Sequence, residues 1–141
     1  MDNVSDITKF LKKQIAEMRG ETSIVSGYLF GSILKGNAGK TSDIDLAFLL
    51  DEKAYKSDAI IAMAPAHLIA AKVGLQLDRE TDVTILNSAS LEIAYEVVTT
   101  GKCIFEIDPD LRMEYEIKIK GMYFDFRPFL EELRAKSLAH L

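Results

Sequence analysis

Four short stretches of the chain have the length and residue pattern of β-strands. The runs 24–30 and 46–50 are almost continuously apolar and are bounded by turn residues, as expected of buried strands. Polar and apolar residues alternate in 81–86, which is typical of a strand with one polar face. The run 102–107 is the fourth stretch. The pattern therefore predicts a small sheet of about four strands.

Helical spacing of apolar residues predicts the remaining elements. The first helix follows Ser5, carries its apolar residues between Ile7 and Met18, and ends near Gly20. Further helices are predicted at 51–76 with a break or kink near Pro65, at 91–98 with Gly101 as the stop, and from about residue 109 onward. The fold class is therefore α/β (α+β), a small mixed sheet flanked by helices.

Length and charge limit the functions that this chain can have. Its 141 residues predict one domain, 1–141, with no additional substrate-recognition domain. The formal net charge of −5 argues against direct nucleic-acid binding, because such surfaces need clustered Lys and Arg to replace phosphate counterions. A protein or small-molecule acceptor fits this charge better.

We expect no apolar stretch long enough to span a membrane, because the segment 51–76 is predicted to be interrupted near Pro65. The first residues, 1–6, are polar and acidic, unlike a signal peptide. The single cysteine, Cys103, allows no disulfide within the chain. We therefore expect no membrane association and a cytoplasmic protein.

The most informative motif lies between the first two predicted strands. Gly31-Ser32 ends one strand, and Asp43-Ile44-Asp45 opens the next after a gap of ten residues. Residues two apart in a strand point to the same face, so Asp43 and Asp45 are expected side by side at the mouth of the second strand. The spacing places a loop of phosphate size beside two carboxylates.

These residue types suit a nucleotide and a divalent cation. Two adjacent carboxylates repel each other unless a cation lies between them, and Mg²⁺ prefers oxygen ligands and substrate phosphates. Gly31 has no Cβ to block a phosphate, and Ser32 offers a hydroxyl and the first amide of a predicted turn, 33–36. Lys35 and Lys40 flank this loop, either to neutralise phosphate or as ordinary surface lysines.

Gly-Ser, a gap of this length and Asp-x-Asp together resemble the nucleotidyltransferase superfamily that includes DNA polymerase beta. The resemblance implies a third carboxylate on a neighbouring strand, for which Asp82 is the main candidate and Asp78 or Glu80 the alternatives. It also implies that Asp43, Asp45 and Asp82 bind two Mg²⁺ ions and that Gly31 and Ser32 bind ATP, with Asp82 accepting the proton of the attacking hydroxyl.

The order of elements resembles the minimal nucleotidyltransferase family, and a chain of this size resembles its MntA-type antitoxins, which are paired with a HEPN-domain ribonuclease toxin. This resemblance implies transfer of AMP from ATP to a toxin hydroxyl, that of a tyrosine, and a hetero-oligomer with the toxin or a homo-oligomer. Two alternatives stay open. One is a non-catalytic antitoxin or binding subunit, and the other is a transferase for a small, aminoglycoside-like molecule.

The C-terminal helical segment has more aromatic and large apolar residues than one packing stripe needs. They are Tyr115, Met122, Tyr123, Phe124, Phe126 and Phe129. Most are expected in the core, and the surplus predicts a protein interface with Tyr115, Tyr123 and Phe124 as anchors.

Overall fold

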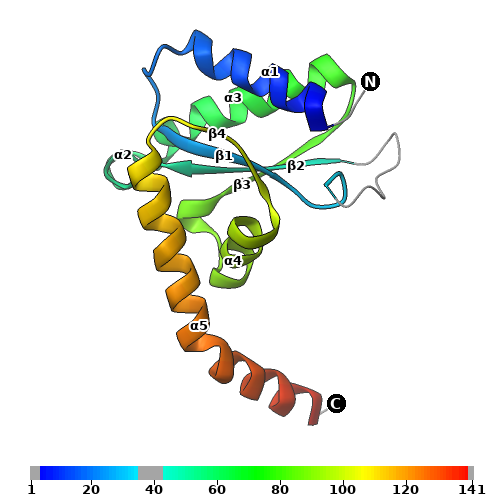
Figure 1. Ribbon diagram of the computed structural model, residues 1–141, viewed down its shortest axis with the longest axis vertical. Coiled ribbons are helices and arrows are strands. Elements are labelled where there is room, and N and C mark those ends of the chain that lie inside the picture. Colours follow the sequence, from blue (N-terminus) through cyan, green and yellow to red (C-terminus); the bar gives the residue numbers. More distant parts are fainter. Residues whose placement is uncertain (1–3, 35–42, 140–141) are drawn as a thin grey trace.

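A computed structural model of the protein describes residues 4–34 and 43–139 (Figure 1). Lys35, Lys40 and the second half of the predicted turn 33–36 lie outside these residues. The helices are α1 (Val4–Glu17), α2 (Glu52–Ser57), α3 (Ala59–Leu77), α4 (Leu91–Thr100) and α5 (Pro109–Ala139), with a 3₁₀ turn η1 (Leu86–Ser88). The strands are β1 (Ile24–Phe30), β2 (Ile44–Leu50), β3 (Thr81–Ile85) and β4 (Lys102–Glu106).

The strands form one mixed sheet in the order β3-β2-β1-β4. β1 pairs antiparallel with both β2 and β4, whereas β2 pairs parallel with β3. The parallel pair follows from the connection, because the helices α2 and α3 carry the chain from the end of β2 back to the edge where β2 began. The predicted α/β class and four-stranded mixed sheet are confirmed.

Helices cover both faces of the sheet, with α1 and α3 on one side and α4 and α5 on the other (Figure 1). The even-numbered residues of β2, from Ile44 to Leu50, pack with α1 and α3 in the first core cluster. The odd-numbered residues Ala47 and Leu49 pack in a second cluster with α4 and α5. This alternation is the strand period of two, so Asp45 shares the face of Ala47 and Leu49.

Three strand boundaries differ from those predicted, and the smallest difference is that β4 ends at Glu106 rather than Ile107. β2 starts at Ile44 rather than Leu46, because the Ile44 amide donates to the Glu80 carbonyl at 2.9 Å and starts the parallel ladder. β3 ends at Ile85, after which the chain turns so that the Asn87 side chain bonds the Leu50 amide and carbonyl, both at 2.9 Å. Asp45 therefore lies within a strand and not at its mouth.

The long helical segment after β2 breaks at Asp58 and not near Pro65. Asp58 has extended backbone angles and its side chain accepts from the Ile61 amide at 3.1 Å, so it ends α2 and caps α3. Pro65 lies inside α3, which continues through it. A proline removes one helical hydrogen bond, but a side-chain cap determines where this helix begins.

The unbroken α3 changes the expectation that no stretch is long enough to span a membrane. By length and composition alone, α3 is long and apolar enough to cross a membrane, since it has 19 residues and a mean hydropathy of 1.5. One face packs on the sheet through Ala62, Ala66, Ile69, Ala70 and Val73. The opposite face exposes Ile60, Ile61, Leu68 and Leu75. α3 is therefore part of the folded body and presents an apolar surface.

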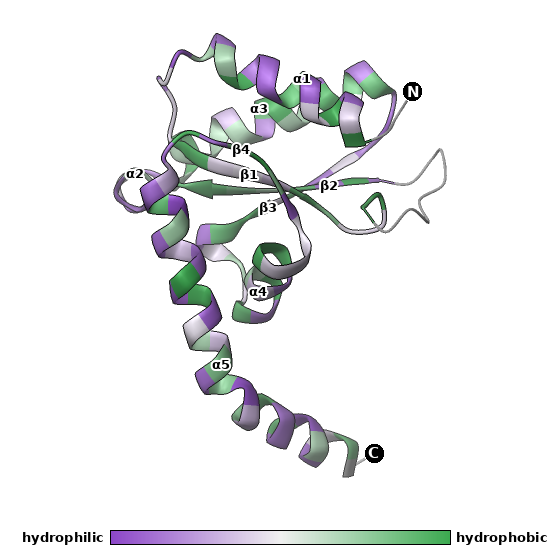
Figure 2. Ribbon diagram, viewed as in Figure 1, coloured by the Kyte–Doolittle hydropathy of each residue, from purple (hydrophilic) through white to green (hydrophobic). Residues whose placement is uncertain are grey.

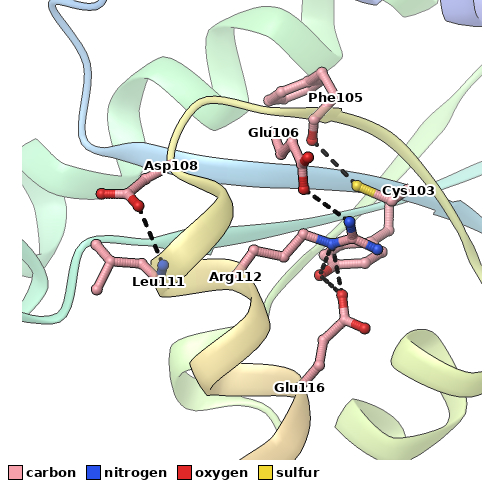
Figure 3. A network of polar contacts seen from close by, with 8 residues as sticks. Cys103, Phe105, Glu106, Asp108, Leu111, Arg112 and Glu116 are labelled. Atoms are coloured by element: carbon pink, nitrogen blue, oxygen red, sulfur yellow. Dashed lines mark hydrogen bonds and ion pairs between the residues drawn. The ribbon is translucent and has the colours of Figure 1, made fainter.

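Polar contacts attach the first turns of α5 to the sheet (Figure 3). Arg112 bonds Glu106 of β4 at 2.8 Å and Glu116, one turn further along α5, at 2.6 Å. The Tyr28 hydroxyl of β1 donates to the same Glu116 carboxylate at 2.8 Å. Burial raises the pKa of Tyr28, so this phenol stays protonated and keeps donating.

The aromatic residues of α5 have different environments, in contrast to the prediction that three of them are anchors for a partner. Tyr115 packs in the second core cluster and Tyr123 stacks on Tyr95 of α4 with ring centroids 3.7 Å apart. Phe124 is 77% exposed. Tyr115 and Tyr123 face α4 because they repeat with Ile119 at the helical period, whereas Phe124 follows one residue later on the outer face.

Candidate functional site

The acidic residues of the motif meet at the end of the sheet where β2 and β3 begin. Asp45 lies in β2, with Phe30 of β1 and Asp82 of β3 as its Cα partners on either side. Directly opposed residues of neighbouring strands point to the same face, so Asp45 and Asp82 project together. This face is the one covered by α4 and α5.

Electrostatics indicate that three carboxylates crowd this point. The pKa of Asp45 is raised by burial first, then by the charges of Asp82 and Asp43 and by a hydrogen bond to Asp82. Asp43 is exposed and directly precedes β2, and Asp82 is exposed in β3. Asp45 is thus the least accessible member, and its two acidic neighbours make its ionisation costly.

This raised pKa predicts a pH-dependent cost to stability. The pKa of Asp45 in the folded protein lies above its unfolded value of 3.8, so its ionisation at neutral pH lowers the free energy of unfolding. This loss of stability disappears as the pH falls through the folded pKa toward the unfolded pKa, because the carboxyl is then protonated in both states. Without divalent cations, Asp45→Asn should therefore melt higher than the parent near neutral pH. The difference should shrink as pH falls toward about 4. Melting curves across this range test it, and a pH-independent difference would contradict it.

Gly31 makes room for Asp45. It follows the last residue of β1 with φ of +83°, a left-handed conformation that side chains rarely adopt. A Cβ built at Gly31 would overlap Oδ2 of Asp45 and lie 3.0 Å from its Cγ. The Gly31 backbone therefore lies directly against the carboxylate that β2 holds, and any larger residue would displace it.

Ser32 follows in a turn that the Leu34 amide closes by donating to the Gly31 carbonyl at 3.2 Å. Ser32 is half-buried. The turn lies next to the acidic group because Gly31 contacts Asp45. Backbone amides of such a turn, with a serine hydroxyl, form a small site suited to an anion.

Asp78 and Glu80, the two alternative candidates for the third carboxylate, do not lie opposite Asp45. Asp78 is the C-cap of α3, with a left-handed φ of 51°. Glu80 precedes β3, and its carbonyl accepts the bond that starts the β2 ladder. Only Asp82, of these three, is in register with Asp45. The geometry thus brings together Asp43, Asp45 and Asp82, the three residues that the sequence proposed.

The donor set fits Mg²⁺ in chemistry, since all three side chains are carboxylates. In the conformation described for residues 4–34 and 43–139, no three Asp, Glu, His or Cys side chains converge tightly enough to hold an ion. Asp45 is hydrogen-bonded to Asp82 instead. A bound cation would replace this contact between Asp45 and Asp82.

Sequence reasoning did not find the contact between Gly31 and Asp45. The sequence predicts that Gly31 lets a phosphate approach the backbone. In the structure the missing Cβ of Gly31 also leaves room for the carboxylate of Asp45, which lies 14 positions later in the chain. Phe30, the other strand partner of Asp45, was also not singled out. No pattern in the sequence reports the register that brings these residues together.

Comparison with known proteins identifies the family. The family described as "Polymerase beta, Nucleotidyltransferase" matches residues 7–110. Protein adenylyltransferase MntA of Shewanella oneidensis is 31% identical over 121 residues, which are 86% of this chain and 77% of that protein.

Two solved structures support the same relationship. A toxin–antitoxin structure with AMP-PNP matches with a TM-score of 0.64 and 25% identity, covering 90% of this chain and 98% of the other. A mutant toxin–antitoxin complex of MntA matches with a TM-score of 0.64 and 26% identity, covering 98% and 99%. The predicted resemblance to minimal nucleotidyltransferases and MntA-type antitoxins is confirmed. Most of the chain, including all three carboxylates, falls within the matched family region, and the protein belongs to the polymerase beta nucleotidyltransferase family.

Proposed function

We propose that this protein is an antitoxin that transfers AMP from ATP to a tyrosine hydroxyl of a HEPN-domain toxin and so neutralises it. The observation that carries the proposal is the placement of Asp43, Asp45 and Asp82 around the Gly31 turn at one end of the sheet. The related MntA is named a protein adenylyltransferase, and a related toxin–antitoxin structure holds AMP-PNP, a non-hydrolysable ATP analogue.

The Gly31-Ser32 turn binds the triphosphate in this proposal. Its amides and the Ser32 hydroxyl donate to phosphate oxygens, and the missing Cβ of Gly31 lets the backbone approach. Asp43, Asp45 and Asp82 would hold the magnesium, which when bound neutralises phosphate charge and polarises the α-phosphate. The β2–β3 register positions two of these carboxylates before substrate arrives.

The reaction needs one displacement at phosphorus. The acceptor oxygen forms a bond to the α-phosphorus of ATP, the bond from that phosphorus to the bridging oxygen breaks, and pyrophosphate leaves. Asp82 accepts the hydroxyl proton, since it is the exposed carboxylate beside Asp45. Positioning and charge neutralisation account for most of the rate in this type of transfer, so a compact site suffices.

A protein acceptor fits the surface chemistry. The net charge of −5 disfavours a nucleic-acid acceptor. The Asp45 side chain lies on the face of the sheet that α4 and α5 cover. α5 extends from the body on this side (Figure 1). A protein bound along these helices would lie on the same side of the sheet as the carboxylates.

The test is a transfer assay with ATP labelled at the α-phosphate, magnesium, and a HEPN-domain toxin. We expect label on the toxin, pyrophosphate release and loss of toxin ribonuclease activity. Toxin inhibition without label would favour the non-catalytic antitoxin, and label on an aminoglycoside but on no protein would favour the small-molecule transferase. Either outcome would overturn the proposal.

Three variants test the assignment of the third carboxylate. We expect Asp82→Asn to lower transfer at least about a hundredfold, because it removes both a magnesium ligand and the proton acceptor. Asp78→Asn and Glu80→Gln are matched controls that should keep parental rates, since neither side chain is in register with Asp45. If either control loses activity and Asp82→Asn does not, the third carboxylate has been misassigned.

Ser32→Ala is expected to weaken Mg-ATP binding by about tenfold. A hydrogen bond to a charged phosphate contributes about 1.5 kcal/mol, which corresponds to a factor of ten in affinity. Ser90→Ala is the control, because Ser90 caps α4 through the Ile93 amide and lies outside the site. It should lower stability by about 1 kcal/mol and leave ATP affinity unchanged. Calorimetric titration measures both, and unchanged affinity of Ser32→Ala would place the phosphate site elsewhere.

A further inference from the structure

α5 has apolar residues on two opposite faces. The inner face, with Tyr115, Ile119 and Tyr123, packs against the second core cluster and α4. The outer face carries Met113, Ile117, Gly121 and Phe124 at spacings of four, four and three residues, which places them in one stripe along the helix. Apolar and hydrophilic residues alternate along α5 (Figure 2). We call these four residues the outer stripe.

The outer stripe does not take part in the packing of this chain. Met113 is 63% exposed, Ile117 is 65% exposed and Phe124 is 77% exposed. One apolar face is enough to attach a helix to its own protein, so a second, exposed face indicates an external partner. Single exposed apolar residues are common, but an ordered stripe over about three helical turns is not.

Gly121 supports the same conclusion independently. It lies in the interior of a 31-residue helix, where glycine is among the least favourable residues. A Cβ at this position would meet nothing within 4 Å, so the packing of this chain does not require a glycine. Small residues between large apolar ones allow another helix to approach closely. Gly121 thus forms a notch between Ile117 and Phe124.

The comparisons indicate which partner covers this face. The family match ends at residue 110, where α5 has just begun, so α5 is not part of what the general family shares. A chain from a toxin–antitoxin complex, in contrast, matches 98% of this protein. Because α5 is 31 of the 141 residues, that match includes nearly all of it. α5 therefore lies outside the region that the general family shares but within the match to a chain that pairs with a toxin.

We propose that the outer stripe is the docking face for the toxin and that an apolar helix of the toxin packs across the Gly121 notch. This inference rests on the proposed function, because it takes the toxin as the partner. The stripe lies on a helix that covers the same face of the sheet as Asp45, so a docked toxin can present a hydroxyl on the side of the carboxylates.

Two variants of the stripe test the inference against a matched control. Gly121→Leu fills the notch, and Phe124→Lys places a charge in the apolar stripe. Leu75→Lys makes the same type of change on α3, where Leu75 is 85% exposed and lies in the region shared by the general family. Each purified variant is titrated with a HEPN-domain toxin that binds the parent and, separately, with Mg-ATP.

We expect both α5 variants to lose at least tenfold in toxin affinity, while Leu75→Lys binds as the parent does and all variants bind Mg-ATP normally. Gly121→Leu should also melt no lower than the parent, since leucine favours a helix, so its loss of binding would not reflect unfolding. Normal toxin binding by the α5 variants, or equal loss in Leu75→Lys, would overturn the inference.

Two further results separate this inference from its alternatives. If the parent binds no HEPN-domain protein but binds Mg-ATP, the proposed function fails at its partner, and the docking face fails with it. If the parent alone is a dimer in light scattering and Phe124→Lys is a monomer with parental toxin affinity, the outer stripe joins two copies of this chain, which overturns the toxin assignment.

Discussion

Asp45→Asn is expected to reduce nucleotide transfer by at least about a thousandfold while the protein remains folded. Asp45 is the central carboxylate, between Phe30 and Asp82 in the sheet, and is the least exposed of the three acidic residues. A bound cation stabilises the transition state by several kcal/mol, and each 1.36 kcal/mol changes the rate tenfold. Loss of its central ligand should remove most of that effect.

The measurement is single-turnover AMP transfer to the toxin, together with a melting curve of the cation-free protein. The melting temperature should hold or rise, because the substitution also removes repulsion from Asp43 and Asp82. Asp43→Asn should show the same pattern. Retained activity in either variant would refute the catalytic assignment, whereas a collapse in stability would show that the carboxylates are structural.

Gly31→Ala is expected to reduce transfer about a hundredfold, although it removes no carboxylate. The new methyl group would overlap Oδ2 of Asp45, so the carboxylate must move or the turn must open. A displacement of about 1 Å at a reacting group costs roughly a hundredfold in rate. The substitution also strains the backbone, because φ at Gly31 is +83°.

Gly20→Ala separates displacement from strain. Gly20 has nearly the same φ, +77°, but a Cβ there meets nothing within 4 Å. Both variants should therefore lose a similar amount of stability, about 1 kcal/mol, while only Gly31→Ala loses transfer. Chemical denaturation gives the first quantity and the transfer assay the second. Equal activity in the two variants would reduce the role of Gly31 to that of an ordinary turn glycine.

Local signals in the sequence predicted most of the elements. β1 has the predicted bounds of 24–30, and α4 begins at the predicted Leu91 and stops directly before Gly101, the predicted stop. α5 begins at Pro109, also as predicted. These boundaries depend on a few adjacent residues, so the chain specifies them locally.

Boundaries set by distant contacts were predicted less well. β2 extends back to Ile44 because Glu80, 36 positions later, offers a carbonyl to it. The long helical segment divides at Asp58, where an acidic cap has more influence than Pro65. The apolar length of α3 became evident only once Pro65 was seen inside a continuous helix. The start of β2 thus depends on a distant partner, whereas the Asp58 cap is a local contact with Ile61 that outweighs Pro65.

The sequence by itself determined the chemistry of this protein. The residue types and spacing of Gly31, Ser32, Asp43 and Asp45 predict two carboxylates close in sequence to a glycine-serine turn, and strand periodicity puts the two carboxylates on one face. Composition also determined the acidic surface that disfavours nucleic acid.

Only the tertiary structure decided how these groups meet and which surface stays free. The parallel register of β2 and β3 places Asp82, and not Asp78 or Glu80, opposite Asp45, since pairing depends on a crossover through α2 and α3. Packing on α4 turns Tyr115 and Tyr123 inward and leaves Phe124 outside. Strand register and the rotation of a helix about its axis depend on packing between many residues. The sequence pattern therefore limits the possible arrangements but does not determine one of them.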